Sequence, residues 1–248
     1  MKLTPYGKSI WLPALLIAVC LIAAVCAVSR IFPHILTGSG AFAISFLTVC
    51  IFLILAALFR DPVRQIPAEP ELILSPSDGN VSDIELVKNE SLNTPELREL
   101  FHGQDVLRIG IRLFVFNVRI CRMPAAAEIL FKSCKKDTLR ETGDGTASVR
   151  ETETVMLGCK SGAGDVAFPV AVRHFSGSAA KRIVCEATEG ASYSKGEPYG
   201  LINTGSRTEI YLPCKGFEVT VKVGGNVFAG VTPLARLLPD AKEKLQQH

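Results

Sequence analysis

The first 60 residues contain no aspartate or glutamate, and only four basic residues interrupt them. Between Ile10 and Ser29 there is no charged residue at all, and Ala41–Phe59 is again uncharged and rich in Leu, Ile, Phe and Ala. Each of these runs would rise roughly 28–30 Å as a helix, which matches the hydrocarbon core of a bilayer. The sequence therefore predicts two transmembrane helices.

A cleaved signal peptide is the alternative for the first run, because two lysines precede it as in a charged leader. The length of that run and the presence of a second one argue against a signal peptide. The link Ser29–Gly40 carries only Arg30, whereas the outer flanks carry four basic residues, namely Lys2, Lys8, Arg60 and Arg64. Positive flanks favour the cytoplasmic side. We therefore expect a hairpin anchor over residues 1–59 in the cell (inner) membrane and a cytoplasmic domain over residues 60–248.

The remainder of the chain has no excess of basic residues. Without Lys2, Lys8 and Arg30, the 27 basic residues become 24, equal to the 24 acidic residues. No nucleic-acid partner is expected, because such a partner needs a clustered basic face. The eight cysteines show no Cys-x-x-Cys or Cys/His ligand spacing. We therefore expect free thiols in a reducing compartment and no metal site.

Short β-prone runs separated by turns follow Glu69. Leu72–Leu74, the turn Ser75–Gly79 and Val81–Leu86 predict a hairpin, and Leu107–Leu113 alternates with a period of two. Further strands are expected at Glu128–Cys134, Thr154–Cys159, Val166–Arg173, Arg182–Ala187, Arg207–Leu212 and Phe217–Val223, with one short helix from Pro95 to about Phe101. This pattern indicates an all-β domain.

A weak internal repeat refines that prediction. Gly190, Tyr193 and Gly196 have the same spacing as Gly224, Val227 and Gly230, and a proline follows each set. Such hairpins resemble those of biotinyl/lipoyl-like barrel-sandwich domains. Two ordinary hairpin turns are the alternative.

The segment Tyr199–Pro213 places two apolar, β-prone runs on either side of Thr204-Gly205-Ser206. Glycine allows the backbone to distort at such a bend, so the turn is a suitable place for a reactive serine hydroxyl. Most Gly-Ser pairs are solvated turns, and the pair alone does not distinguish a reactive serine from such a turn.

The residues around this pair carry a resemblance. Gly205-Ser206-Arg207, followed by an acidic residue, an aliphatic one and Tyr-Leu-Pro, resembles the processing site of the phosphatidylserine decarboxylases of the short, archaetidylserine-decarboxylase-like type. Four other segments match the family in the same order: Leu58–Pro62, Leu74–Val81, Phe114–Val118 with Arg122–Pro124, and Lys181–Cys185. The match covers most of the region from Phe59 to about Leu238. It implies an all-β soluble domain with a barrel-sandwich, biotinyl/lipoyl-like core, here preceded by two transmembrane helices.

The resemblance implies a zymogen that cuts itself between Gly205 and Ser206, giving chains 1–205 and 206–248. Ser206 would become a pyruvoyl group, a covalent cofactor that accepts the electrons as CO₂ leaves the serine head group. The implied activity is that of a carboxy-lyase of phospholipid biosynthesis, which converts phosphatidylserine or a similar serine phospholipid to phosphatidylethanolamine. The two chains would form a heterodimer, and its further assembly stays open.

Other family positions imply further site residues. Asp78 matches an aspartate that orients or polarises the reacting groups, although a turn aspartate that caps its own backbone is the alternative. Arg122 and Arg207 match positions where a guanidinium can bind the phosphodiester of the substrate. A solvated strand face is the commoner reason for any single arginine.

One position departs from the family. Where the family has Phe-Asn-Val-His, this chain has Phe116-Asn117-Val118-Arg119. A guanidinium stays charged and cannot carry a proton as histidine does, but it can bind a carboxylate or phosphate. His174 is the candidate replacement, and an ordinary surface or core histidine at a strand end is the alternative. Two alternatives follow from Arg119: a non-catalytic membrane-anchored homologue, or a pyruvoyl lyase diverted to another amino-acid-bearing substrate.

Overall fold

The computed structural model describes residues 2–34, 37–92, 94–114, 116–143, 146–163, 166–176, 183–202 and 207–241. The chain forms two compact units, Met1–Val63 and Arg64–His248.

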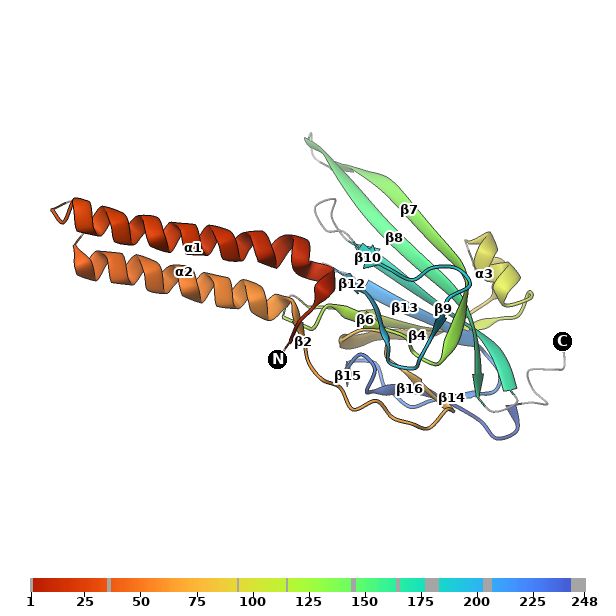
Figure 1. Ribbon diagram of the computed structural model, residues 1–248. Coiled ribbons are helices and arrows are strands. Elements are labelled where there is room, and N and C mark those ends of the chain that lie inside the picture. Colours follow the sequence, from red (N-terminus) through yellow and green to blue (C-terminus); the bar gives the residue numbers. More distant parts are fainter. Residues whose placement is uncertain are drawn as a thin grey trace. The chain divides into compact units, whose positions relative to one another are not determined.

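The N-terminal unit is a helical hairpin. Helix α1 (Lys8–Ile31) and helix α2 (Gly38–Leu58) lie side by side, as Figure 1 shows, and both are long and apolar enough to cross a membrane. The Thr37 hydroxyl caps α2 by accepting a hydrogen bond from the Gly40 amide at 3.3 Å. A short helical turn η1 (Pro5–Gly7) precedes α1, and strand β1 (Lys2–Leu3) pairs with β2 (Arg60–Asp61). The two predicted helices are thus confirmed as helices.

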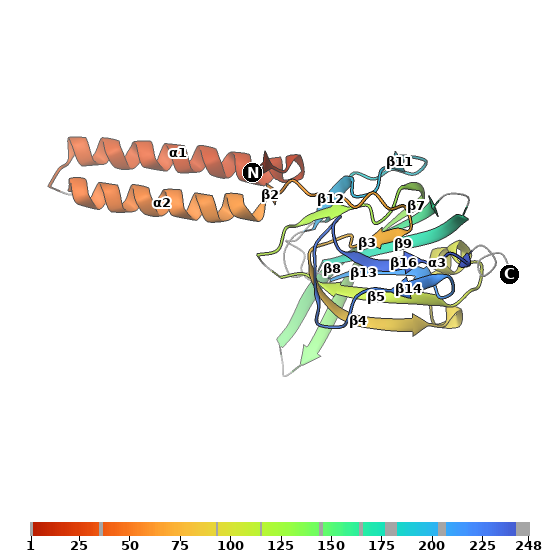
Figure 2. The same ribbon diagram turned by 90° about the horizontal axis from the view of Figure 1, so that it is seen from below.

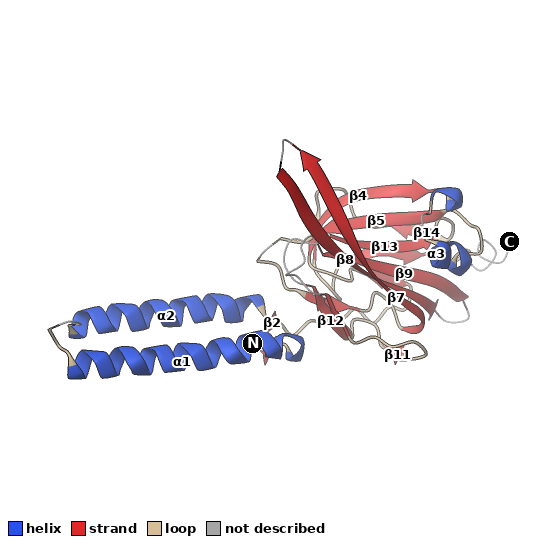
Figure 3. Ribbon diagram, turned by 90° about the horizontal axis from the view of Figure 1, so that it is seen from above, coloured by secondary structure: helices blue, strands red, loops and turns tan. Residues whose placement is uncertain are grey.

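The second unit is mostly β-sheet, as the sequence predicts (Figure 3). Its main feature is a curled, antiparallel sheet of eight strands in the order β11-β7-β8-β9-β13-β5-β4-β15. The bounds of these strands are β4 Gly79–Val87, β5 Val106–Arg112, β7 Ala127–Gly143, β8 Thr146–Ala163, β9 Val166–Ser176, β11 Ser192–Tyr193, β13 Arg207–Pro213 and β15 Asn226–Val227. Strand β13 lies inside the sheet, between β9 and β5. Strands β7 and β8 extend well beyond the short runs that the sequence predicts.

Two small sheets complete the β unit (Figure 2). One has the order β10-β12-β6, and the other has the order β14-β16-β3. Their bounds are β3 Leu72–Leu74, β6 Ile120–Arg122, β10 Ile183–Cys185, β12 Pro198–Ile202, β14 Phe217–Val219 and β16 Pro233–Leu237. A short turn η2 (Asn89–Ser91) and helix α3 (Pro95–Leu100) connect β4 to β5. One apolar core contains Ile111, Val172 and Ile210, and a second contains Ile129, Leu157 and Tyr199.

The repeat predicted from glycine spacing has a structural counterpart. The four glycines of the two hairpins all have positive φ, between 70° and 86°, a backbone conformation that favours glycine. Their amides donate equivalent hydrogen bonds of 2.8 Å: Gly224 to Val81, Gly230 to Ser75, Gly190 to Ile129 and Gly196 to Met123. The two hairpins therefore hold the start of β4 and the start of β7 in the same way, which fits a barrel-sandwich core.

Candidate active site

The predicted cleavage site, Gly205-Ser206, lies outside the described residues, but the strands on both sides of it are described. Strand β12 ends at Ile202 in a small sheet, and β13 begins at Arg207 in the middle of the large sheet. The chain therefore passes from one sheet to the other across residues 203–206.

Strand β12 reaches this point through a close approach and an irregular register. A Cβ on Gly200 would lie 2.2 Å from the Val184 carbonyl oxygen, so β10 can approach β12 only because residue 200 is a glycine. The pairing of β12 with β6 shifts between Pro198 and Gly200, which makes Tyr199 the extra residue of a bulge. Bulges redirect side chains, and the side chain of the bulged residue here, Tyr199, is fully buried.

His174 connects the two strands that flank the cleavage site. On β9 it faces Thr208 of β13 as a directly opposed pair. Its Nδ1 atom lies 3.0 Å from the Thr208 hydroxyl and its Nε2 atom lies 2.6 Å from the Tyr199 hydroxyl. Both His174 and Thr208 are fully buried, and Tyr199 is 1% exposed. The sequence singles out His174, but it gives no sign of its two partners.

The burial of His174 decides its charge. Burial lowers its pKa from 6.5 to about 3, and among the described residues no charged neighbour counteracts this effect. Burial also raises the pKa of Tyr199 well above its ordinary value. The imidazole is therefore neutral at physiological pH, and its two hydroxyl contacts suit a neutral ring, which donates at one nitrogen and accepts at the other.

Asp78 lies on the turn between β3 and β4 and is 4% exposed. The Arg64 guanidinium donates to both of its carboxylate oxygens, at 3.1 and 2.9 Å, and the Ala229 amide donates to Oδ1 at 2.7 Å. Arg64 also lies over the Phe228 ring, 5.6 Å from its centroid. Two donors, Arg64 Nη2 and the Ala229 amide, therefore hold the carboxylate through three hydrogen bonds. In the sequence, Arg64 stands out only as a basic residue that flanks the helical hairpin, and no motif there indicates this contact.

Arg119 lies beside the end of β12. Its carbonyl accepts a hydrogen bond from the Ile202 amide at 2.9 Å, and the residue is 7% exposed. Burial lowers the pKa of its guanidinium, which still remains charged at neutral pH. The fold thus brings the position that departs from the family pattern next to the strand that leads into the cleavage site.

Arg122 connects the Asp78 turn to a glycine hairpin. Its amide donates to the Pro76 carbonyl at 3.0 Å, and its guanidinium donates to the Gly196 carbonyl at 2.9 Å. The residue is 8% exposed. These contacts give Arg122 a structural task beside the predicted aspartate. Its predicted contact with substrate stays a prediction.

Arg207, directly after the predicted cleavage serine, is held by two carboxylates. Its guanidinium lies 2.8 Å from Asp83 Oδ1 and 2.9 Å from Glu209 Oε1. Gly110 makes room for this network, because a Cβ there would lie 2.5 Å from Asp83 Oδ2 and 2.9 Å from an Arg207 nitrogen. Partial burial opposes ionisation of Asp83, yet the Ser82 hydroxyl and Arg207 hold its pKa below the ordinary value. The predicted role of Arg207 in substrate binding would have to coexist with these ion pairs.

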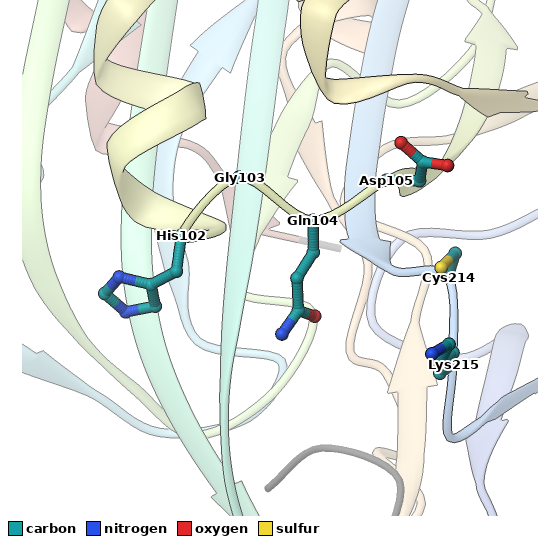
Figure 4. Close-up of a pocket in the computed structure, with 6 residues that line it drawn as sticks. All are labelled: His102, Gly103, Gln104, Asp105, Cys214 and Lys215. Carbon is teal, nitrogen blue, oxygen red and sulfur yellow. The ribbon is translucent and has the colours of Figure 1, made fainter. Parts of the chain in front are cut away.

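A pocket of about 340 Å³ lies where β5 begins and β13 ends, at the opposite end of β13 from Arg207 (Figure 4). Its lining comes from the loop before β5 and the segment after β13, and consists of His102, Gly103, Gln104, Asp105, Cys214 and Lys215. None of the predicted site residues that the structure describes lines it. Within the described part of the chain, no group of three His, Cys, Asp or Glu side chains could hold a metal ion.

Comparison with known proteins decides the family. The model of the phosphatidylserine decarboxylase family matches residues 52–235, which include the Gly205-Ser206 pair and every other predicted site residue. The chain belongs to the phosphatidylserine decarboxylase family. The resemblance predicted from five sequence segments is thereby confirmed.

Curated members of the phosphatidylserine decarboxylase family resemble this chain over most of its length. The phosphatidylserine decarboxylase proenzyme of Gluconacetobacter diazotrophicus is 35% identical over 181 residues, which is 72% of this chain and 75% of that protein. The proenzyme of Burkholderia lata is 32% identical over 86% of this chain and 92% of its own length. The proenzyme of Neisseria meningitidis serogroup B is 30% identical over 84% of this chain and 80% of its own length. No solved structure matches the chain.

Proposed function

We propose that this protein decarboxylates phosphatidylserine, or a similar serine phospholipid, to phosphatidylethanolamine, using a pyruvoyl group made from its own Ser206. The family match over residues 52–235 carries this proposal. Support comes from the Asp78 turn, the strands that flank Gly205-Ser206, and relatives whose names identify them as phosphatidylserine decarboxylase proenzymes.

Self-cleavage would proceed in three steps at the Gly205-Ser206 peptide. Ser206 Oγ attacks the Gly205 carbonyl, the C–N bond breaks and an ester forms, while the proton of the hydroxyl passes to the freed amine. Elimination then removes the Cα proton of residue 206 and breaks its Cβ–Oγ bond, so that a Cα–Cβ double bond forms and the carboxylate of chain 1–205 is released. Water finally replaces the nitrogen, which leaves as ammonia. The products are chain 1–205 and a chain 206–248 that begins with a pyruvoyl group.

The residues around the cleavage site fit such a group. Its ketone supplies an electron sink for the departing CO₂, and this chemistry works best where water is excluded. The flanking residues Ile202 and Thr208 are fully buried, and Tyr199 and His174 beside them are uncharged at neutral pH. Arg207, the next residue, is fixed by Asp83 and Glu209. A group formed at residue 206 would therefore be attached to a strand whose first residue is held by two ion pairs.

Two kinds of charged side chain would serve the reaction. Asp78, an acceptor held in one orientation by Arg64 and the Ala229 amide, would orient or polarise the reacting groups. Arg119 would bind an anionic part of the substrate, its carboxylate or phosphate, because a guanidinium can do so bidentately. Arg122 and Arg207 remain candidates for the phosphodiester.

The membrane anchor suits a lipid substrate, because a tethered enzyme meets head groups at the interface. The hairpin α1–α2 would place both chain ends in the cytoplasm, since the basic residues lie on its outer flanks. Reporter fusions at His34 and at His248 should therefore report opposite sides of the membrane. A cytoplasmic signal from both positions would contradict the hairpin.

Intact-mass measurement of the denatured full-length protein, beside Ser206→Ala, tests the proposal. We expect two chains that separate between Gly205 and Ser206, with the smaller one blocked at its amino terminus and reactive to a carbonyl reagent. The cleaved protein should then convert phosphatidylserine in detergent micelles to phosphatidylethanolamine. A single chain with the same mass pattern as Ser206→Ala would contradict self-cleavage, and a cleaved protein that leaves the head group unchanged would contradict the activity.

Arg119 favours a second candidate, a homologue that cleaves itself but has lost decarboxylation or acts on a different amino-acid-bearing substrate. The observation behind it is the buried guanidinium where the family carries a histidine. In this case the two chains form, but phosphatidylserine is not consumed.

A further inference from the structure

We propose that His174 is a positioning residue that holds together the two strands on either side of the Gly205-Ser206 peptide, through the Tyr199 and Thr208 hydroxyls. The inference rests on the proposed self-cleavage and assigns a part of its machinery. His174, Tyr199 and Thr208 are here named the histidine clamp.

The histidine clamp connects strands that belong to different sheets. Tyr199 lies on β12, three residues before the end of that strand, and Thr208 is the second residue of β13. These strands belong to different sheets, and β12 pairs with β10 and β6 rather than with β13. His174, on β9, contacts both. It therefore fixes the separation of the two chain ends that residues 203–206 must connect.

Local features of the chain are consistent with this task. His174 continues the inward-facing row of β9 that begins with Phe168, Val170 and Val172, so an apolar side chain would fit the pattern better. The bulge at Tyr199 redirects that side chain, which the regular pairing of β12 with β6 would not do. A polar residue in an apolar row, His174, and a bulged residue, Tyr199, thus meet in the histidine clamp.

The surroundings of the clamp favour positioning over proton transfer. The titratable groups around Tyr199 are the thiols Cys121, Cys159 and Cys185, and burial raises the pKa of each. These groups are uncharged at neutral pH, as are His174 and Tyr199. A neutral imidazole already uses both nitrogens in hydrogen bonds, so it has no free site for a third partner.

The clamp would also act after cleavage. Tyr199 and His174 belong to chain 1–205, whereas Thr208 belongs to chain 206–248. The Thr208 contact would therefore hold the new chain end, which carries the reactive group, against the larger chain. Rigid placement of a reacting group is worth orders of magnitude in rate, so a loosened end should slow turnover as well as cleavage.

Cleavage kinetics of the full-length protein test the clamp. The time course of cleavage after cell-free synthesis would be compared for wild type, His174→Ala, His174→Gln, Tyr199→Phe and Thr208→Val. Ser161→Ala is the matched control, because Ser161 is also buried and its hydroxyl makes one partly buried hydrogen bond, to the Ala126 carbonyl at 2.8 Å, at the far end of β8. We expect His174→Ala to slow cleavage about tenfold or more, because the buried Tyr199 and Thr208 hydroxyls lose a hydrogen-bond partner. His174→Gln should restore most of the rate, and Ser161→Ala should cleave normally.

The pH profile separates positioning from proton transfer. If His174 only positions, wild type and His174→Gln have profiles of the same shape between pH 5.5 and 8.5. Two outcomes would overturn the inference in favour of proton transfer. The pH profile of the wild type could have a limb that disappears in His174→Gln, or His174→Gln could lose cleavage while it keeps wild-type stability. Wild-type rates in all clamp variants would overturn it as well.

Amide hydrogen exchange in the Ser206→Ala background keeps the test independent of cleavage. His174→Ala should accelerate exchange at Leu201 and Ile202 on one side and at Thr208 and Glu209 on the other, whereas Ser161→Ala should not. Unchanged exchange on both sides overturns the clamp even if wild type cuts itself. A wild type that stays uncut, together with faster exchange in His174→Ala, refutes the proposed function and leaves the clamp standing.

Discussion

The Arg64 guanidinium and the Asp78 carboxylate form a largely buried ion pair, in which Arg64 Nη2 donates to both carboxylate oxygens and the side chains are 13% and 6% exposed. Arg64 is the first residue of the β unit, whereas Asp78 lies on the turn that the family motif predicts to be in the site. Paired charges at this depth depend on each other, because removal of one leaves the other buried and uncompensated.

Arg64→Gln should therefore lower the free energy of unfolding by about 3 kcal/mol and slow self-cleavage strongly. Arg64→Lys should lie between it and wild type, because an ammonium keeps the charge but loses the planar group that lies over the Phe228 ring. Thermal denaturation and cleavage time courses measure both effects. Arg236→Gln, at an exposed position of β16, is the control and should change stability by less than about 0.5 kcal/mol. Wild-type cleavage in Arg64→Gln would show that Asp78 needs no such partner.

Gly200→Ala should disturb the approach to the cleavage site. Its Cβ would lie 2.2 Å from a backbone oxygen of β10, so the two strands would have to move apart. We expect a loss of about 2–3 kcal/mol in stability, together with slower self-cleavage.

Gly162→Ala on β8 is the matched control for Gly200→Ala. Its nearest neighbour would be the Val166 carbonyl oxygen at 3.5 Å, an ordinary contact. Denaturant unfolding should find this variant close to wild type. Equal stability of the two variants would mean that β12 can shift without cost.

The depressed pKa of His174 predicts how stability depends on pH. The folded protein holds the imidazole neutral down to about pH 3, whereas the unfolded chain takes up a proton near 6.5. Between these values the unfolded state binds more protons, so stability falls as the pH is lowered below 6.5 and is unaffected by this group above it. Urea unfolding of the full-length Ser206→Ala protein should show a loss of about 1.4 kcal/mol per pH unit that His174→Gln lacks. Parallel pH curves for the two proteins would contradict the buried neutral state.

Arg119→His tests whether this chain departs from the decarboxylation chemistry of its family. If Arg119 is the reason for weak or diverted activity, the substitution should raise the turnover of phosphatidylserine, because histidine can exchange protons near neutral pH. The head-group assay would be done on cleaved protein, with Arg119→Gln as the control that removes the charge without adding a titratable group. Loss of turnover in both variants would instead assign substrate binding to the guanidinium.

Local pattern was enough to predict much of this fold. Uncharged runs gave the two helices, the alternation at Leu107–Leu113 gave β5, and the glycine spacing gave the paired hairpins, because each of these signals lies within a few residues. Strands β7 and β8 were predicted too short, since residues 137–152 are largely polar and lack apolar alternation. Their length comes from the pairing of the two strands.

The partners of the predicted site residues could not be predicted in this way. Arg64 and Asp78 meet because an irregular segment passes a turn. His174 and Thr208 meet only when β9 and β13 pair in a particular register, and a slip of one residue would turn each side chain to the other face. The bulge at Tyr199 has no signature in the sequence either. Single motifs therefore indicated which residues matter, while the contacts that control their charge and orientation required the fold.

The interior position of β13 gives the proposed cut a thermodynamic consequence. Chain 206–248 would contribute β13, hydrogen-bonded to β9 on one side and β5 on the other, as well as β14, β15 and β16. Before the cut, refolding is unimolecular; afterwards, the lost strand must be recaptured from solution, so recovery becomes dependent on protein concentration. Maturation would thus turn a protein that can refold alone into one whose assembly is preserved chiefly by the slowness of unfolding.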